Sequence, residues 1–503
     1  MLKSAAIVGA GIAGIAAAVR LAVQGYTVDV FEANAYPGGK LSGFEQDGYR
    51  FDAGPSLFTM PQLVEELFRL AGRRPEDYFQ YIRLDETCRY FWDDGTRLTA
   101  WADRDAFARE VETKIGEPAG HLLDHLADSA EKYRITEKLF LERSLHRLST
   151  WLNRDALLGY LNLPKLEVFR TMNAANEKRF AHPKLVQLFN RYATYNGSDP
   201  YRTPATMNII PHLEYNIGAF FPKEGMVGIT NSLVRLAREL GVRFHFNTRV
   251  TGLVTTENRI VGLKTAPANP LSGALEHREE TLPFDLVVSN MDIVSTFRKL
   301  LPQARQPERI LRQPKSSSGL IFYWGIRKEF SELGLHNIFF SSDYRAEFDA
   351  LFNRQNLSDD PTVYLNITSK HKPDDAPPGC ENWFILINAP NNTGQDWDAL
   401  IDRTRQNVIR KLSRALGTEI APLIACEALL DPRTIESRTS SAQGALYGNS
   451  SNNRFAAFLR HANFSRQFRN LYFVGGSVHP GGGIPLCLQS ARIATDLVAE
   501  RMR

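Results

Sequence analysis

Three glycines and one acid near the start of the chain have the types and spacing of a dinucleotide site. Gly9, Gly11 and Gly14 follow the pattern G-x-G-x-x-G, and Glu32 stands further along the chain. In such a pattern the first glycine allows a tight turn, the second lets the backbone approach a pyrophosphate, and the third lets a helix pack closely on a strand. Glu32 can accept hydrogen bonds from the two hydroxyl groups of an adenosine ribose, and its charge would repel a 2′-phosphate. These residues predict a bound dinucleotide with an unmodified ribose.

Local patterns around these residues predict the elements that would position them. Residues 5–8 form an apolar run of the length of a buried strand, residues 12–24 form an alanine-rich helix pattern, and residues 26–31 form a second strand pattern. The helix would begin directly after the glycine turn, so its N-terminal N–H groups would face the pyrophosphate. We therefore expect a strand–helix–strand unit with Glu32 at the tip of its second strand.

A second glycine-rich segment lies near the end of the chain. Residues 471–474 form a short buried strand pattern, and the run "PGGGIP" at 480–485 forms a stiff corner before a helix that starts near residue 486. A helix that begins after a glycine turn offers a site for an anion or a polar ring. His479 in this segment could contact a cofactor or take a proton, but a structural role in the turn is the favoured interpretation. We expect this segment to form the second half of the nucleotide site.

A long insertion separates the two glycine-rich segments. Residues 61–190 are mostly helical in pattern, and strand patterns return near residue 218. A helix at 227–240 then precedes "VRFHFNTRV", which suits a strand added to the first parallel sheet, and "FDLVVSNMD" at 284–292 is another buried strand pattern. The nucleotide-binding domain therefore resumes after the insertion.

One part of this insertion has two interpretations. Residues 145–172 are rich in leucine and carry Trp151, Tyr160 and Phe169. Taken alone, these residues favour a helical subdomain that buries its apolar face. The alternative is a surface that lies among lipid headgroups.

Composition limits the other classes of function. The 503-residue chain has a net charge of +4, which gives no indication of a nucleic-acid partner. Its four cysteines are scattered without a C-x-x-C pair, which is typical of reduced intracellular thiols and predicts no metal site. No uncharged apolar run approaches the roughly 18 residues that a membrane-spanning helix needs. The first strand begins almost at once, so we expect no signal peptide, and any membrane contact would be peripheral.

Several segments, in a fixed order along the chain, resemble one family of flavoproteins. They are "GAGIAGIAAAVRL", "VDVFEANAYPGGK", "GYRFDAGPS", "ATYNGSDPYRTPATMNIIPHLEYNIGAFFPKEGM", "FDLVVSNMD", "TSSAQGALYG" and "NLYFVGGSVHPGGGIPLCLQSARIA". Together they cover essentially the whole chain and resemble the carotenoid desaturases of the phytoene desaturase type. The resemblance implies an α/β fold: a Rossmann-like FAD-binding domain of the glutathione reductase and amine oxidase type, a discontinuous α+β substrate domain, and a helical region that faces the membrane.

The resemblance also implies domain boundaries and cofactor contacts. The FAD-binding domain would comprise residues 1–75, 221–299 and 456–503, the helical substrate or membrane-facing region residues 76–220, and the substrate domain residues 300–455. The first three glycines would hold the FAD pyrophosphate, Val250 would lie by the adenine, and the C-terminal residues would approach the ribityl chain and isoalloxazine. The residues placed against FAD are Gly9, Gly11, Gly14, Glu32, Gly38, Gly39, Lys40, Val250, Gly475, Gly476, Gly482, Ile484 and Pro485.

A narrower resemblance suggests the reaction. The segments "LHNIFFSSDYRAEFDALF", "PTVYLNITSK" and "WFILINAPNNTGQDWD" look like the branch that introduces a 3,4 double bond into 1-hydroxycarotenoids. Within that branch they resemble the Bacteroidetes-type enzymes most. A hydrophobic carotenoid must be taken from the bilayer, which makes the membrane-surface interpretation of residues 145–172 the favoured one. Oxygen or a quinone would accept the electrons, and the protein would be cytoplasmic and attached peripherally to the inner face of the cell membrane.

This reaction requires little acid–base catalysis by protein side chains. Hydrogen leaves a carbon beside the conjugated chain as hydride, flavin is the natural acceptor, and loss of a proton from the neighbouring carbon completes the double bond. We accordingly name no catalytic residue from the sequence. Three other functions stay open: phytoene desaturation, redox-neutral carotenoid isomerisation, and isoprenoid binding by a non-enzymatic escort protein of the same fold.

Overall fold

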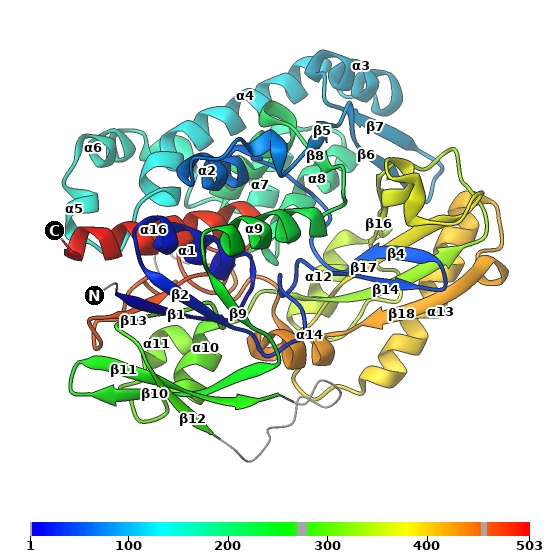
Figure 1. Ribbon diagram of the computed structural model, residues 1–503. Helices are drawn as coiled ribbons and strands as arrows, with labels where there is room; N and C mark the ends of the chain where they lie inside the picture. The colour runs from blue at the N-terminus through cyan, green and yellow to red at the C-terminus, as the bar shows by residue number, and fades with distance from the viewer. Residues whose placement is uncertain (1–2, 269–278, 454–459, 503) are drawn as a thin grey trace.

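The computed structural model describes residues 3–268, 279–453 and 460–502 of the chain (Figure 1). A five-stranded parallel sheet and a seven-stranded sheet lie in different halves of the molecule, and helices cover both. The two termini lie close together beside the five-stranded sheet. The α/β fold with a parallel sheet is thus the one expected from the sequence.

The five-stranded sheet is assembled from segments that are far apart in the chain. Its order is β19-β13-β1-β2-β9, and every neighbouring pair is parallel. Its strands are β1 (Ser4–Val8), β2 (Thr27–Phe31), β9 (Arg243–His245), β13 (Leu286–Ser289) and β19 (Leu471–Phe473). The expected strand from "VRFHFNTRV" is confirmed, because β9 pairs with β2 at the edge of this sheet.

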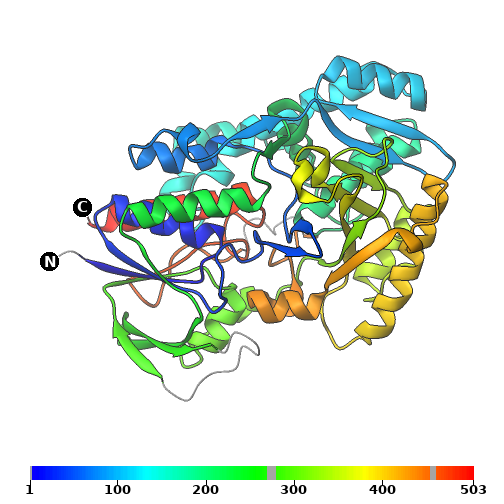
Figure 2. The same cartoon turned by 45° about the vertical axis from the view of Figure 1, so that its right-hand side comes forward.

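Burial on both faces explains why β1 is apolar from Ala5 to Val8. Ala5 and Ile7 face a helical layer, whereas Ala6 and Val8 face a small antiparallel sheet. The helical layer is α1 (Ile12–Val23), α2 (Gln62–Leu70), α9 (Val227–Glu239) and α16 (Ile484–Met502). The small sheet is β10 (Thr248–Thr256), β11 (Arg259–Pro267) and β12 (Glu280–Pro283). Figure 2 shows these three layers stacked, with the first residues of α1 directed at the middle of the molecule.

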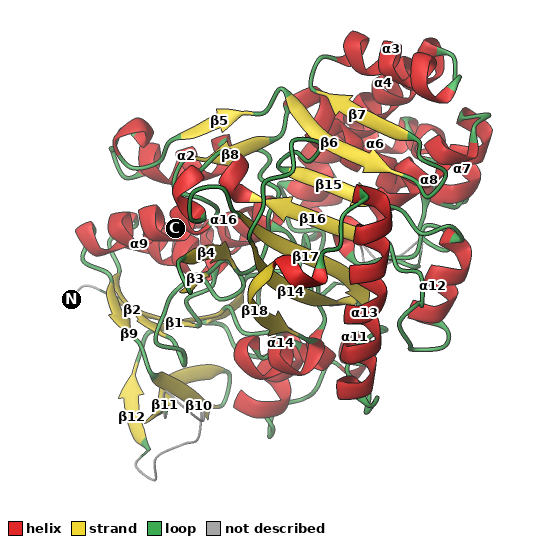
Figure 3. Cartoon of the chain, turned by 90° about the vertical axis from the view of Figure 1, so that its right-hand side faces the viewer, coloured by secondary structure: helices red, strands yellow, loops and turns green. Residues whose placement is uncertain are grey.

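The seven-stranded sheet forms the other half (Figure 3). Its order is β18-β14-β17-β16-β15-β6-β7, antiparallel except between β15 and β6. Its strands are β6 (Glu86–Phe91), β7 (Arg97–Trp101), β14 (Ser318–Ile326), β15 (His336–Phe339), β16 (Val363–Ile367), β17 (Glu381–Ala389) and β18 (Ile424–Leu430). Phe322 and Trp324 pack on the outer face with α13 (Trp397–Leu416), whereas Ile321 and Tyr323 point to the opposite, inner face.

Residues 61–190 are mostly helical, as expected, but two strands of this sheet, β6 and β7, also lie among them. In β7 the buried Leu98 and Ala100 alternate with more exposed neighbours, which is the period of a strand and not of a helix. A third strand, β5 (Tyr81–Arg83), pairs with β8 (Phe220–Pro222). The division of the chain into three domains stays a prediction.

The remaining elements surround these sheets. The helices are α3 (Arg104–Ile115), α4 (Ala119–Thr136), α5 (Leu148–Trp151), α6 (Arg154–Leu161), α7 (Met172–Arg179), α8 (Pro183–Asn190), α10 (Ile293–Ser295), α11 (Glu308–Leu311), α12 (Tyr344–Phe352) and α14 (Pro432–Thr439). The strands β3 (Gly43–Gln46) and β4 (Tyr49–Asp52) form an antiparallel hairpin that turns at Asp47 and Gly48. Among the described residues, no helix combines the length and apolarity needed to cross a bilayer.

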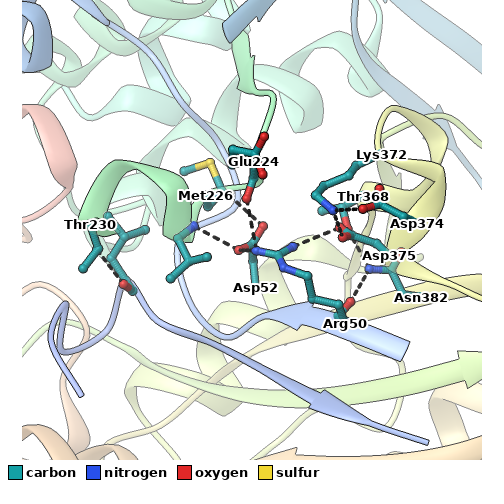
Figure 4. A network of polar contacts seen from close by, with 12 residues as sticks. Arg50, Asp52, Glu224, Met226, Thr230, Thr368, Lys372, Asp374, Asp375 and Asn382 are labelled. Carbon is teal, nitrogen blue, oxygen red and sulfur yellow. Dashed lines mark hydrogen bonds and ion pairs between the residues drawn. The ribbon is translucent and has the colours of Figure 1, made fainter. Parts of the chain in front are cut away.

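A buried ionic network joins the two halves (Figure 4). The carboxylate of Asp52 accepts hydrogen bonds from the backbone N–H groups of Met226 (2.8 Å) and Val227 (3.0 Å), which satisfies the start of α9. The guanidinium of Arg50 binds Asp52 at 2.9 Å and Asp375, in the β16–β17 connection, at 3.0 Å. Burial raises the pKa of Asp52, and Arg50 and the two N–H donors oppose that shift. Two charges of one hairpin therefore connect the helical layer to the seven-stranded sheet.

Replacing Asp52→Asn tests this connection. The substitution leaves Arg50 with less compensating charge and weakens both N–H hydrogen bonds, so we expect the free energy of unfolding to fall by about 2–4 kcal/mol. Urea-induced unfolding measures the loss. Asp374→Asn is the matched control, because Asp374 belongs to the same network through Lys372 but its side chain is mostly exposed. Equal losses in both variants would contradict the role of Asp52.

Candidate active site

A cavity of about 1880 Å³ lies between the two sheets. Its volume exceeds the roughly 300–1,000 Å³ typical of a small-molecule site, so it has room for more than one ligand. The residues expected against FAD line this cavity, with the exception of Gly14: they are Gly9, Gly11, Glu32, Gly38, Gly39, Lys40, Val250, Gly475, Gly476, Gly482, Ile484 and Pro485. The fold therefore brings the two glycine-rich segments to one space, and their contacts with FAD stay predictions.

The first glycine turn leaves no room for side chains. A Cβ atom at Gly14 would lie 2.2 Å from the carbonyl oxygen of Gly9, so Gly14 is required for close packing beneath the cavity wall. Gly9 has a φ of +94°, which favours glycine. Gly11 precedes α1 without any side-chain cap, so the N–H groups of the first helical turn are available at the cavity. This arrangement fits a pyrophosphate.

Asn290 is a structural residue that sequence reasoning missed. It follows β13, and its backbone N–H donates to the carbonyl of Val8 at 2.8 Å. Its side-chain nitrogen would lie 2.6 Å from a Cβ at Gly11, and its side-chain oxygen 2.8 Å from a Cβ at Gly475. Asn290 is thus wedged between the first and the last glycine-rich segments. The available signal was a polar residue directly after a buried parallel strand, at the edge where such sheets bind ligands.

Glu32 is held in place by its own neighbours. Its carboxylate accepts hydrogen bonds from the backbone N–H groups of Ala10 and Asn34, both at 2.8 Å. The side-chain N–H of Asn34 also donates to Oε1 of Glu32, at 2.8 Å, so Oε1 accepts two hydrogen bonds and Oε2 accepts one. Oε2 keeps a further lone pair, and Glu32 and Val250 both line the cavity. Glu32 can therefore accept an additional hydrogen bond from a hydroxyl group of a ribose.

The C-terminal segment supplies a second glycine-lined wall. Gly475, Gly481 and Gly483 have φ values of +108°, +146° and +98°, and a Cβ at Gly482 would lie 2.8 Å from the ring of Tyr447. The helix α16 begins at Ile484, directly after this turn. A flat ring can approach such a wall closely because no side chain projects from it.

Arg460 adds a positive charge at this wall that the sequence analysis did not find. Its guanidinium donates to the backbone carbonyls of Tyr447 (3.0 Å), Gly476 (3.1 Å) and Asn449 (3.1 Å). Burial lowers its pKa to about 10. Arg460 lines the cavity, so its charge acts on whatever occupies this part of the site.

Two further charges lie near the cavity wall. Lys40 donates to the carbonyls of Ala445 (3.2 Å) and Leu446 (3.0 Å), and removal from water lowers its pKa, opposed by the nearby Asp292. Asp292 caps α10 through the N–H of Val294 at 2.9 Å, and burial raises its pKa. Backbone partners therefore fix both side chains.

The environment of His479 fits the structural role favoured from the sequence. Its Nε2 bonds to the carbonyl of Arg143 at 2.8 Å, so this nitrogen carries the proton. Burial lowers the pKa of His479 to about 3, so its ring stays neutral.

Comparison with known proteins agrees with this geometry. The model of the family "Flavin containing amine oxidoreductase" matches residues 12–499.

The chain belongs to the flavin-containing amine oxidoreductases. A 1-hydroxycarotenoid 3,4-desaturase from Flavobacterium sp. (strain P99-3) is 49% identical over 99% of both chains. A 4,4′-diapolycopene oxygenase from Methylomonas sp. is 34% identical over 99% of this chain and 98% of that protein.

Solved structures of this family share the fold at low sequence identity. A putrescine oxidase variant superposes with a TM-score of 0.64 at 14% identity, covering 100% of this chain and 99% of that one. Cyclohexylamine oxidase from Brevibacterium oxydans IH-35A gives 0.61 at 14%, covering all of both chains. The uncapped first turn of α1 and the two glycine walls fit FAD, and this flavin-containing amine oxidoreductase is an FAD-dependent enzyme.

Gly14→Ala tests the tight turn. The new methyl group would collide with the Gly9 carbonyl, so we expect a loss of about 1–3 kcal/mol in the free energy of unfolding and a lower FAD content. The ratio of flavin to protein absorbance, with thermal unfolding, measures both. Gly120→Ala is the control, because a Cβ there meets nothing within 4 Å. An FAD content in Gly14→Ala equal to that of the wild type would contradict the role of this turn.

Proposed function

We propose that this enzyme desaturates a long carotenoid, and that its substrate is a 1-hydroxycarotenoid which gains a 3,4 double bond in carotenoid biosynthesis. The observation that carries the proposal is the 49% identity to a desaturase of that name over 99% of both chains. The more distant oxygenases named for carotenoids support the same class of substrate.

The second half of the cavity suits a hydrocarbon chain. Ile321, Tyr323, Phe384 and Leu386 line it from the inner face of the seven-stranded sheet. Apolar residues from the segment between α8 and β8 also line the cavity, among them Ile210 and Leu213. Such a surface binds a polyene through apolar burial and excludes water from it.

The protein contributes to the reaction mainly by positioning the polyene against the cofactor, and less by transferring protons. When bound, FAD supplies the acceptor for the hydride that leaves the carotenoid. The glycine walls allow the polyene and the cofactor to lie close together, and the apolar sheet face holds the reacting carbons in line. Electrons then pass to oxygen or a quinone, and we assign no protein side chain to the proton.

The region of α5 and α6 supports a membrane-facing role. It lies at one edge of the molecule (Figure 1). Leu152, Leu161 and Phe169 expose 75%, 70% and 82% of their surface. Phe169 and the half-exposed Leu163 also line the cavity. The apolar patch therefore adjoins the rim of the cavity, where a carotenoid could pass directly from lipid into the site. We propose peripheral attachment to the inner face of the cell membrane, with the rest of the protein in the cytoplasm.

Anaerobic mixing with a 1-hydroxycarotenoid tests the reaction. We expect the yellow flavin absorbance to fall while the carotenoid loses two hydrogens, with one new double bond per flavin reduced. Absorbance and mass spectrometry of the extracted pigment measure the two changes. Isomerisation without flavin reduction would favour the isomerase, and conversion of phytoene alone would favour a phytoene desaturase. A protein that binds carotenoid but cannot be loaded with FAD would favour an escort function.

A triple variant, Leu152→Ser, Leu161→Ser and Phe169→Ser, tests the membrane surface. Each change removes apolar side-chain area, so we expect affinity for vesicles of mixed neutral and anionic lipid to fall at least about tenfold, measured by co-sedimentation. The control is the double variant Leu70→Ser and Val261→Ser, which changes partly exposed apolar residues elsewhere. Unchanged vesicle binding in the triple variant would overturn the assignment.

A further inference from the structure

A group of polar side chains around His336 lies in the otherwise apolar substrate half of the cavity. Alternation along β15 and β16 turns His336 and Tyr364 to the inner face of the seven-stranded sheet, and both line the cavity. The hydroxyl of Tyr364 lies 2.8 Å from Nδ1 of His336 and 2.7 Å from Oγ of Ser56. The side-chain N–H of Asn366 also donates to Nδ1 of His336, at 3.2 Å. His336 is 4% exposed.

These contacts determine which nitrogen of His336 carries the proton. Because Nδ1 accepts from Asn366, the proton of the neutral ring is on Nε2. Burial lowers the pKa of His336 to about 3, so the neutral form is present at physiological pH. Nε2 has no hydrogen-bond partner among the described residues. His336 therefore lines the cavity and carries a buried N–H donor that has no partner among the described residues.

A charged cluster of Arg191, Tyr195 and Glu214 also lines this cavity and makes its wall more polar. Arg191 donates to the hydroxyl groups of Tyr90 and Tyr195, both at 2.9 Å, and the hydroxyl of Tyr195 donates to Glu214 at 2.7 Å. Arg191, Tyr195 and Glu214 line the cavity, and the charge of Arg191 contributes to the lowered pKa of His336. Buried polar groups destabilise a site for a pure hydrocarbon, because each of them loses its hydration and gains no partner from the ligand. The arrangement indicates a ligand with a polar end.

Hydrogen bonds connect His336 to a segment that packs on the residues predicted to bind FAD. Ser56 follows Gly54, and a Cβ at Gly54 would lie 1.8 Å from the carbonyl of Lys40, so this segment packs directly on the predicted FAD-binding residues. Hydrogen bonds then lead from Ser56 to Tyr364 and from Tyr364 to His336. A hydroxyl at C1 of a carotenoid is only two carbons from C3. A group that recognises this hydroxyl must therefore lie near the flavin, and the contacts from Ser56 through Tyr364 connect His336 to the segment that packs on Lys40.

We propose that His336 is a specificity residue whose Nε2–H donates a hydrogen bond to the terminal hydroxyl of the substrate, with Tyr364 and Ser56 as positioning residues. This inference rests on the proposed 1-hydroxycarotenoid substrate. With the hydroxyl bound, the donor has a partner and the C3–C4 bond is held in register with the cofactor. A carotenoid that ends in hydrocarbon leaves the donor unpaired, so it binds less well.

His336→Phe tests the proposal with two substrates that differ in one group. One is the 1-hydroxycarotenoid, and the other carries hydrogen in place of the hydroxyl. We expect the wild type to prefer the hydroxylated carotenoid in kcat/KM, and His336→Phe to lose about 10–100-fold of that preference with little change for the other substrate. His336→Gln keeps an N–H donor and should restore part of the preference. His371→Phe is the matched control, because His371 does not line the cavity.

Several outcomes would overturn the proposal. Equal loss for both substrates would make His336 a structural residue, and an unchanged preference would exclude its contact with the hydroxyl. If His336→Phe does not fold, Tyr364→Phe carries the same test, since it removes the hydroxyl that orients the ring. Direct titration of both carotenoids, followed by their absorption, separates the two claims. A wild type that converts neither carotenoid contradicts the proposed function, whereas one that binds both equally contradicts the role of His336.

Discussion

The close approach of backbone segments at the carboxyl edge of the parallel sheet is the constraint on which the rest of the structure depends. Asn290 occupies the point where the first and the last glycine-rich segments meet, and a Cβ at Gly11 or Gly475 would fall within 3 Å of its side chain. Glycine allows this packing without a shift of Asn290, and the N-terminus of α1 that follows Gly11 lies at the cavity, where it can bind an anion. The glycines are therefore needed for the fold as much as for the cofactor.

The remainder of the molecule builds a second wall opposite that edge. The seven-stranded sheet turns an apolar face inward, and the β3–β4 hairpin carries Arg50 and Asp52, which connect this sheet to α9. A carotenoid and FAD can thus share one cavity although their binding surfaces come from different sheets. Polar backbone surrounds the cofactor side, whereas mostly apolar side chains surround the substrate side, where the groups around His336 and Arg191 are polar.

The sequence predicted most of the local structure and the addition of β9 to the parallel sheet, but not the side-chain contacts that depend on long-range register. The unit from β1 to Glu32 follows from short-range patterns, and so do the hairpin at Asp47 and the start of α16. The roles of Asn290 and Arg460 depend on segments that meet only in the folded chain. The pairing of β6 with β15 likewise joins strands that are distant in sequence, so the local alternation of apolar residues cannot predict it. The contact between His336 and Tyr364 depends on the register of β15 and β16, which puts both residues on one face of the sheet.

A crystal structure of the protein with FAD and a 1-hydroxycarotenoid would show whether one cavity holds the cofactor at the glycine edge and the polyene against the sheet. We expect the pyrophosphate at the first turn of α1, the flavin beside residues 475–485, and the carotenoid along the inner face of the seven-stranded sheet with its C3–C4 bond at the flavin. Density for the carotenoid outside this cavity, or for FAD away from the first turn of α1, would contradict this arrangement.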